Sequence, residues 1–410
     1  MRMDSSKPNL LIIGDYLRKD ILYFFDDLSF TFNLFFIHYN YDYEIRNKVY
    51  SPYIKILFYY QFSSAFSLLK KIKPKKVLFF NFDSFNDLAL LMASKECGIK
   101  TYHIEHGFRD YNIIRYLYRH QKKISINKPK SKQYYSFINL KRIKNFLFYK
   151  KTSFLSKYKK QLNGYWKVKR KSDFFECSKF IGEKKLLPDM FVSFSQKNYE
   201  FHNIVYNLNE NINVKYIGYL YSDKFISKSN FNTTSKKIVF IDGGYHKFNF
   251  FDVTNTYVTN FYMQLNIICK KFGYELFVKK HPIDETTAID ESLTRIISDE
   301  EFTKRFGEFS IVAGDYSTLF LILLGNMNTL GLCFNMFPDK GINPVGFLRS
   351  YNVAMEIKGF EEVENLLKSE EKVLNSYFGQ FENKKNYVNN YLFQLDGKAR
   401  ERLNEIIING

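Results

Sequence analysis

The chain has 410 residues, more than the about 100–200 of one ordinary domain, so its length predicts two domains. Apolar residues make up 45% of the sequence, as in globular proteins, which excludes a largely disordered chain. Lys and Arg outnumber Asp and Glu by 61 to 42, for a net charge of +19. Residues 111–171 hold 19 of these basic residues and no acidic one, so the excess charge belongs to one segment and the rest of the chain is balanced.

Cysteine spacing and apolar runs indicate where the protein resides. The four cysteines are widely spaced and form no C-x-x-C pair, a pattern typical of reduced thiols in a cytosolic protein. They are Cys97, Cys177, Cys269 and Cys333. The apolar run at residues 10–13 is too short for a signal peptide or a membrane span, and the run at 319–334 is interrupted by Gly and Asn. We therefore expect no transmembrane helix, and any membrane contact would be peripheral.

Short β-rich runs alternate with helical patterns in the first half of the chain. The strands predicted there are residues 10–13, 34–38, 77–80, 100–104, 190–194 and 214–219. The helices predicted there are residues 61–72 and 86–97. Strands that alternate with helices of about 10–15 residues are typical of βαβ units, so this half predicts a parallel sheet.

A polar segment, residues 222–235, is the best candidate for a linker, and a second alternating pattern follows it. The strands predicted there are residues 237–241, 275–279, 310–313, 330–334 and 353–357. Helices are predicted at residues 256–272, at 360–368 and in the last 30 residues. Two α/β halves joined by a linker predict a bilobed enzyme with its ligand in the cleft.

Glu105, His106 and Gly107 follow the predicted strand 100–104, at the edge where open parallel sheets bind their ligands. A carboxylate at the end of a strand can act as a general base, and a following glycine lets the backbone turn. The simpler interpretation is a solvent-exposed turn from strand to loop.

His281 and Pro282 follow the predicted strand 275–279. Proline holds the residue before it in an extended conformation and stops the strand, which leaves the imidazole at the strand's tip. A histidine there can bond to a phosphate or donate a proton to it, because its pKa lies near neutrality. The alternative is a single exposed histidine.

Asp315, Ser317 and Thr318 lie in a turn between the predicted strand 310–313 and an apolar helix. Hydroxyl groups in the first turn of a helix can bind an anion together with free backbone N–H groups. The alternative is that Asp315 or Ser317 caps the helix, and the two roles are compatible.

Gly243 and Gly244 follow the predicted strand 237–241 and permit a phosphate to approach the backbone closely, although any connection from a strand to a helix can use such a turn. The sequence contains no P-loop, no G-x-G-x-x-G fingerprint and no metal-binding motif of the H-E-x-x-H or D-x-D type. We therefore expect neither a bound cofactor nor a metal site.

In chain order, the motifs Glu105-His106-Gly107, Lys279-Lys280-His281-Pro282 and Ser317-Thr318 resemble those of bacterial sialyltransferase and polysialyltransferase families with the GT-B fold. Those families carry an acidic-acidic-Gly, a His-Pro and a Ser-Ser/Thr motif at comparable spacing. The resemblance implies two Rossmann-like α/β domains that face a central cleft. Residues 1–225 would form the acceptor-side domain with the basic insertion 111–171, and residues 226–410 the nucleotide-donor domain, whose last helix packs back on the first.

The resemblance also implies a role for each motif. Glu105 would be the base that deprotonates the acceptor hydroxyl, and His106, which stands in place of a carboxylate, is the alternative base. His281 would contact the donor phosphate and act as an acid for its departure. The residues implied in donor binding are Gly243, Gly244, His281, Pro282, Asp315, Ser317 and Thr318.

The implied reaction is the inverting, metal-independent transfer of a sialic or related nonulosonic acid from a CMP donor to a capsule or lipopolysaccharide glycan. Residues 314–318 also resemble a motif of teichoic-acid glycerophosphotransferases, which use CDP-glycerol and have a His-Gly near their base. Transfer of a polyol phosphate from a CDP donor is therefore the alternative reaction. In both cases we expect a cytoplasmic enzyme on the inner face of the bacterial membrane.

The basic segment 111–171 interleaves lysines with aromatic residues, a composition that suits nucleic acid, anionic lipid or an acidic polysaccharide. No RNA-binding or helix-turn-helix signature accompanies it, so we expect a membrane or acceptor contact and no nucleic-acid partner. The alternative is a solvated loop. The lysines predicted to make the contact are Lys150, Lys151, Lys157, Lys159 and Lys160.

Overall fold

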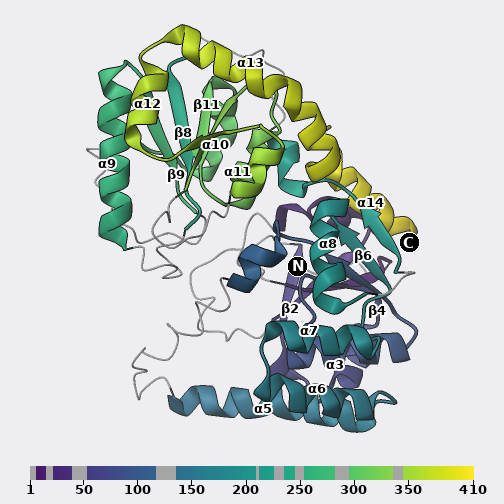
Figure 1. The fold of residues 1–410 in the computed structure, drawn as a ribbon. Helices are drawn as coiled ribbons and strands as arrows, with labels where there is room; N and C mark the ends of the chain where they lie inside the picture. The colour runs from purple at the N-terminus through teal and green to yellow at the C-terminus, as the bar shows by residue number, and fades with distance from the viewer. Residues whose placement is uncertain are drawn as a thin grey trace. The chain divides into compact units, whose positions relative to one another are not determined.

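The computed structural model consists of two compact units (Figure 1). The first comprises residues 1–107, 127–217 and 400–410, and the second comprises residues 108–126 and 218–399. Within them the structure describes residues 6–14, 22–38, 53–116, 135–208, 212–225, 235–244, 254–281, 295–335 and 345–410, with the backbone alone for 135–139.

The described strands of the first unit form a seven-stranded sheet in the order β3-β2-β1-β4-β5-β6-β7, and every neighbouring pair is parallel. The strands are β1 (Asn9–Ile13), β2 (Asn33–His38), β3 (Ile54–Phe58), β4 (Pro74–Phe79), β5 (Lys100–Ile104), β6 (Met190–Ser193) and β7 (Val214–Tyr216). Helices cover both faces of a parallel sheet, which explains why its inner strands consist of continuous apolar residues.

Seven α-helices of the described chain belong to the first unit. They are α2 (Ala65–Ile72), α3 (Phe85–Glu96), α5 (Tyr135–Leu155), α6 (Lys159–Lys171), α7 (Phe174–Glu183), α8 (Gln196–Tyr206) and α14 (Ala399–Asn409). The side chains of Ser64, Ser84 and Ser195 cap α2, α3 and α8 by accepting a backbone N–H bond in the first turn. Apolar side chains of α2, α3, α5, α6 and α7 form one core with the strands.

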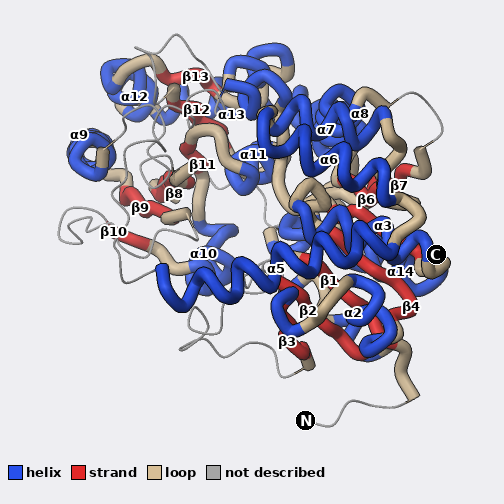
Figure 2. The backbone as a smooth tube through the Cα atoms, turned by 90° about the horizontal axis from the view of Figure 1, so that it is seen from below, coloured by secondary structure: helices blue, strands red, loops and turns tan. Residues whose placement is uncertain are grey.

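The second unit contains a six-stranded parallel sheet in the order β10-β9-β8-β11-β12-β13 within the described residues. The strands are β8 (Lys237–Ile241), β9 (Glu275–Lys279), β10 (Arg295–Ile296), β11 (Ile311–Gly314), β12 (Leu330–Phe334) and β13 (Met355–Ile357). The helices are α9 (Asn255–Lys271), α10 (Asp299–Arg305), α11 (Thr318–Leu324), α12 (Phe360–Leu367) and α13 (Glu370–Tyr387). Figure 2 shows α9 and α12 on one side of these strands and α11 on the other.

Short helical turns connect several of these elements. The 3-10 turns are Asp27–Phe30, Tyr59–Gln61, Leu220–Lys224, Phe306–Glu308 and Gly346–Ser350, and a π-helical turn spans Val388–Leu392. No helix in the described ranges has the length and apolar character needed to cross a bilayer. All four cysteines lie in described residues and are free thiols, three of them buried and Cys97 exposed.

The chain returns to the first unit through α14. The Lys76 ammonium donates hydrogen bonds to the carbonyl oxygens of Ile407 and Ile408, the latter at 3.2 Å, and so satisfies the last turn of the helix. Arg402 Nε donates to the carbonyl oxygen of Ile217 at 2.8 Å, and Arg400 pairs with Asp27 at 2.8 Å. These contacts fix the end of the chain to the first unit.

The alternating pattern of strands and helices predicted from the sequence is confirmed, and with it the two parallel α/β sheets. The strands β3 and β10 and the helices α5 to α8, α10 and α13 were not predicted. In α5 the reason is physical, because large apolar side chains lie both in the core and on the exposed face, which blurs the one-sided periodicity of an amphipathic helix.

Candidate functional site

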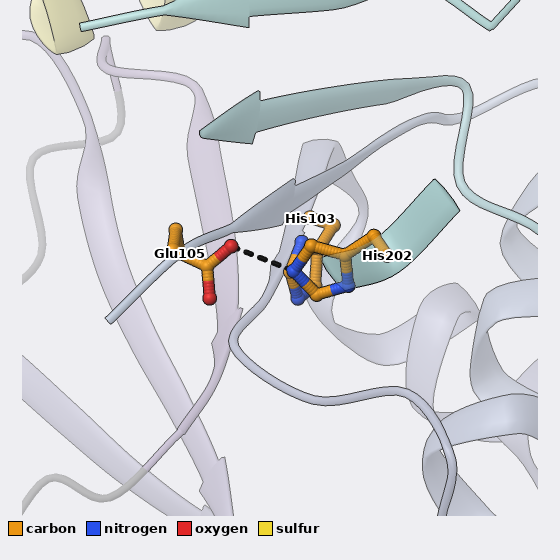
Figure 3. Close-up of side chains that lie close together, drawn as sticks. All are labelled: His103, Glu105 and His202. Carbon is orange, nitrogen blue, oxygen red and sulfur yellow. Dashed lines mark hydrogen bonds and ion pairs between the residues drawn. The ribbon is translucent and has the colours of Figure 1, made fainter. Parts of the chain in front are cut away.

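Glu105 follows β5 in the first unit, and its side chain is completely buried (Figure 3). Its backbone N–H donates to the carbonyl oxygen of Val192 in β6 at 3.0 Å. Its carboxylate forms a hydrogen bond of 2.6 Å between Oε2 and Nε2 of His202, a residue of α8 that is also completely buried. Glu105 is therefore held through its backbone by a neighbouring strand and through its side chain by a helix.

His106 lies on the other face of the strand end. It is half-buried, and its ring meets the ring of Phe80 edge-on, with 5.6 Å between the centroids. Successive side chains of an extended strand point to opposite faces of the sheet, which explains why Glu105 contacts α8 while His106 contacts the residue that follows β4. Of the two candidate bases, His106 is thus the one with solvent-exposed surface.

His103, Glu105 and His202 form a cluster whose nearest ligand-type atoms lie within 4.8 Å of one another. His103 packs edge-on against the His202 ring at a centroid distance of 4.7 Å. Such a set could hold a metal ion by residue type, but the 2.6 Å bond between Glu105 and His202 joins the two atoms directly. Two ligands of a tetrahedral zinc ion lie roughly 3.3 Å apart. The distance between Glu105 and His202 is therefore that of a hydrogen bond and is too short for two ligands of one zinc ion.

Two turns meet at the carboxyl edge of the second sheet, where β8 and β9 are neighbours. Gly244 has a φ of +73°, and its N–H donates to the Asp242 carboxylate at 2.8 Å. A Cβ at position 244 would lie 2.9 Å from Cβ and Cγ of His281, so the glycine makes room for the imidazole. The structure thus brings Gly243, Gly244 and His281 together, while Pro282 lies outside the described residues.

Asp242 and Asp315 form a buried acidic pair at the same edge. They follow the paired strands β8 and β11, in which Ile241 is opposite Gly314, and they are 5% and 2% exposed. Burial, together with the charge of Asp242, raises the pKa of Asp315 well above its usual range, although a backbone N–H bond from Gly243 opposes this shift. Asp315 is therefore protonated more readily than an ordinary aspartate.

Ser317 and Thr318 stand at the start of α11. Ser317 caps the helix, because its Oγ accepts the N–H of Phe320 at 3.2 Å. Thr318 Oγ1 accepts the N–H of Phe108 at 3.0 Å. Each hydroxyl oxygen is thus an acceptor within the protein, and its own proton can still be donated to a ligand.

The basic segment contains α5, which lies on the outside of the first unit next to α3 and α6 (Figure 1). One face of α5 enters the core through Phe148 and Tyr149. The opposite face carries four exposed apolar residues spaced 3, 4 and 7 apart, which we call the apolar stripe of α5. These residues are Leu140 (61% exposed), Ile143 (53%), Leu147 (54%) and Phe154 (69%).

Lysines surround the apolar stripe of α5. Lys144 and Lys151 are exposed on either side of Leu147, and Lys150 lies over the Trp166 ring at 4.0 Å. Lys159 lies over the ring of Phe154, a member of the stripe, at 4.5 Å. Lys157 and Lys160 are exposed just beyond α5. Of the five predicted lysines, Lys159 contacts the apolar stripe, Lys150 lies over Trp166, and Lys151, Lys157 and Lys160 are exposed. Residues 117–134 of the basic segment lie outside the described residues.

Three residues that the structure brings to these sites were not predicted from the sequence. His103 could have been found, because it lies two positions before Glu105 on one strand and so shares its face. Asp242 could also have been found, since it follows a strand as Asp315 does. His202 gave no signal, because nothing in the pattern of α8 shows that it reaches a residue 97 positions earlier.

Comparison with solved structures shows the class of fold. The wall teichoic acid polymerase TagF matches with a TM-score of 0.55 at 12% identity, over 98% of this chain and 88% of that one. The glycotransferase of kitacinnamycin matches with a TM-score of 0.52 at 8% identity, over 98% and 99%. At these identities the similarity concerns the fold alone, and it confirms the GT-B fold of two parallel α/β sheets. None of the curated proteins matches the chain significantly.

The comparison with protein families is more informative. The model of the alpha-2,8-polysialyltransferase family matches residues 39–321, about two thirds of the chain. That range contains Glu105 and His106 as well as His281, Ser317 and Thr318. The predicted resemblance is therefore confirmed, and the protein is a glycosyltransferase with the GT-B fold that belongs to the alpha-2,8-polysialyltransferase family.

Proposed function

We propose that the protein transfers a sialic acid or a related nonulosonic acid from a CMP-activated donor to a glycan of the bacterial surface, such as a capsule or lipopolysaccharide. The observation that carries this proposal is the family match over residues 39–321, which includes every motif at the strand ends. In the reaction, the acceptor hydroxyl oxygen bonds to the anomeric carbon of the sugar. The bond from that carbon to the phosphate oxygen breaks, and its electron pair leaves with CMP.

We assign the general base to the end of β5, and within it to His106. A base must reach the proton that it removes, and His106 is only partly buried, although its Nδ1 atom has no exposed surface. The carboxylate of Glu105 has none and is engaged by His202 at 2.6 Å. The proton of the acceptor hydroxyl thus passes to the His106 imidazole. Inversion at the anomeric carbon follows from a single direct displacement.

The donor phosphate is assigned to the carboxyl edge of the second sheet. His281 supplies a hydrogen bond or a proton as negative charge develops on the departing phosphate, and the Ser317 and Thr318 hydroxyls donate to its oxygens. Gly244 leaves room for the imidazole of His281. The raised pKa of Asp315 makes it easier for this carboxyl group to take up a proton beside a bound anion. These protein groups supply the electrostatic stabilisation, so the proposed reaction is independent of metal.

We also propose that the protein acts at the inner face of the cell membrane, where it binds through α5. The apolar stripe of α5 can enter the boundary between lipid headgroups and acyl chains, while Lys144, Lys151 and the lysines beyond the helix meet anionic headgroups. Each apolar side chain removed from water contributes up to about 1.5–3 kcal/mol. An enzyme held there would meet a lipid-linked acceptor glycan.

The first prediction tests the donor and the base together. The purified protein should release CMP from CMP-sialic acid when a sialylated acceptor is present, and His106→Ala should lower kcat by about 10²-fold or more. CMP release is measured by chromatography, with CDP-glycerol as the rival donor. Release of CMP from CDP-glycerol alone would replace the sialic acid proposal by polyol-phosphate transfer, and a His106→Ala enzyme of normal rate would refute the base.

The second prediction concerns the donor site. Gly244→Ala should weaken binding of the CMP donor about tenfold or more, because the new Cβ meets His281 and a left-handed conformation costs a non-glycine residue about 1–2 kcal/mol. Gly273→Ala is the matched control, since Gly273 has a similar φ of +76° but a Cβ there would meet only Lys236 Cδ, at 3.9 Å. Affinity is measured by calorimetry with CMP. Equal losses in the two variants would speak against a donor site built around His281.

The third prediction concerns α5. The double variant Ile143→Gln with Leu147→Gln should lose about tenfold or more of its binding to vesicles of phosphatidylglycerol and phosphatidylcholine, measured by cosedimentation. Ile204→Gln is the control, because Ile204 is a similarly exposed (54%) apolar residue on α8. CMP release with a soluble acceptor should not change. Undiminished vesicle binding by the double variant would exclude the apolar stripe as the membrane contact.

A further inference from the structure

We propose that His202 is a positioning residue, which through its buried hydrogen bond with Glu105 fixes the strand end that carries His106 (Figure 3). This inference rests on the proposed function, because it takes His106 as the general base. It gives a role to His202, a residue of α8 that belongs to none of the sequence motifs at the strand ends. It also gives Glu105 a role that its complete burial permits.

Glu105 is held by both its backbone and its side chain. Its N–H donates to Val192 in β6, and its carboxylate is bound by His202 in α8, so two different elements restrain one residue. A carboxylate with no exposed surface that lost its hydrogen-bond donor would carry a desolvation penalty. Other conformations of the strand end, in which Glu105 swings away from His202 but stays buried, are therefore disfavoured.

The orientation of the His202 ring is set by its neighbours. The ring of Tyr206 is parallel to it, with an interplanar angle of 3° and 5.9 Å between the centroids. His103 meets it edge-on at 4.7 Å, and Phe191 packs at 5.6 Å. A ring confined in this way cannot turn freely, so its Nε2 atom remains directed at the Glu105 carboxylate. The hydrogen bond is thus preorganised by packing.

The pair is connected to His106 through the backbone. The Cα atoms of consecutive residues are about 3.8 Å apart, and only the dihedral angles between them can redirect the next side chain. With Glu105 fixed toward α8, the alternation of the strand sends His106 to the opposite face, where Phe80 supports its ring. A turn of residue 105 away from His202 would move His106 from that position. The Glu105–His202 pair therefore determines on which face of the first sheet the proposed base, His106, lies.

The test compares variants that keep the hydrogen bond with variants that remove it. Glu105→Gln and His202→Gln retain an acceptor and a donor, so each should keep kcat within about fivefold of the wild type. His202→Phe removes the donor and should lower kcat about tenfold or more, with the KM for the CMP donor unchanged because the second unit is untouched. A loss in Glu105→Gln as large as that in His106→Ala would overturn the inference, since Glu105 would then be the base itself.

A double variant separates positioning from stability. Glu105→Leu combined with His202→Phe replaces both buried polar partners by apolar groups, so its Tm should recover relative to His202→Phe alone. If the pair positions His106, kcat stays low in the double variant although the Tm recovers. If kcat recovers together with the Tm, the pair is merely structural and the inference is wrong.

A spectroscopic readout keeps the inference testable apart from the proposed function. In protein with labelled histidines, the NMR signals of the His106 ring should shift in His202→Phe and remain unchanged in His202→Gln. This measurement requires no turnover. If the wild-type protein released no CMP, the proposed function would be refuted, but NMR would still test the link between His202 and His106. The inference would be overturned if the His106 signals did not shift in His202→Phe. It would also be overturned if the purified protein held an equimolar metal ion at His103, Glu105 and His202.

Discussion

Parallel pairing of the strands is the constraint on which the candidate sites depend. When neighbouring strands run in the same direction, the residues that follow them meet at one edge of the sheet. In the first unit this places His106, after β5, next to Phe80, after β4. In the second it places Asp242, His281 and Asp315 side by side after β8, β9 and β11. Asp242 and Asp315 are more than 70 positions apart in the sequence, and they become neighbours because their strands run in the same direction.

Both edges carry polar groups that the fold removes from water, and each edge satisfies them differently. In the first unit a histidine from a covering helix shares a hydrogen bond of 2.6 Å with the buried Glu105 carboxyl group. In the second, Asp315 lies beside Asp242, and burial together with the charge of Asp242 raises the pKa of Asp315 well above its usual range. The first carboxyl group is bound by a histidine, and the second takes up a proton more readily than an ordinary aspartate. Two buried acidic residues in the same protein therefore have different surroundings, a histidine in one case and a second aspartate in the other.

The basic segment shows how composition and structure complement each other. Its positive charge is evident from the sequence and predicted an anionic partner. The sequence did not show which surface of the segment would bind that partner. The structure shows that α5 has two apolar faces, one in the core with Phe148 and Tyr149 and one exposed with Leu147 and Phe154. The exposed face lies among lysines, so charge and apolar surface are combined on one side of the helix. A helix with apolar residues on both faces has little one-sided periodicity, and for this reason the sequence did not predict it.

The sequence by itself determined the alternation of strands and helices, hence the parallel sheets, and it placed the motifs at the carboxyl ends of β5, β9 and β11. It could do so because hydrophobic periodicity, glycine and proline act over a few residues. Only the tertiary structure decided that Glu105 faces His202 while His106 faces Phe80, and that Asp315 lies beside Asp242. Those contacts join residues up to 97 positions apart. They depend on which helix covers which face of a sheet, and no local pattern encodes that choice.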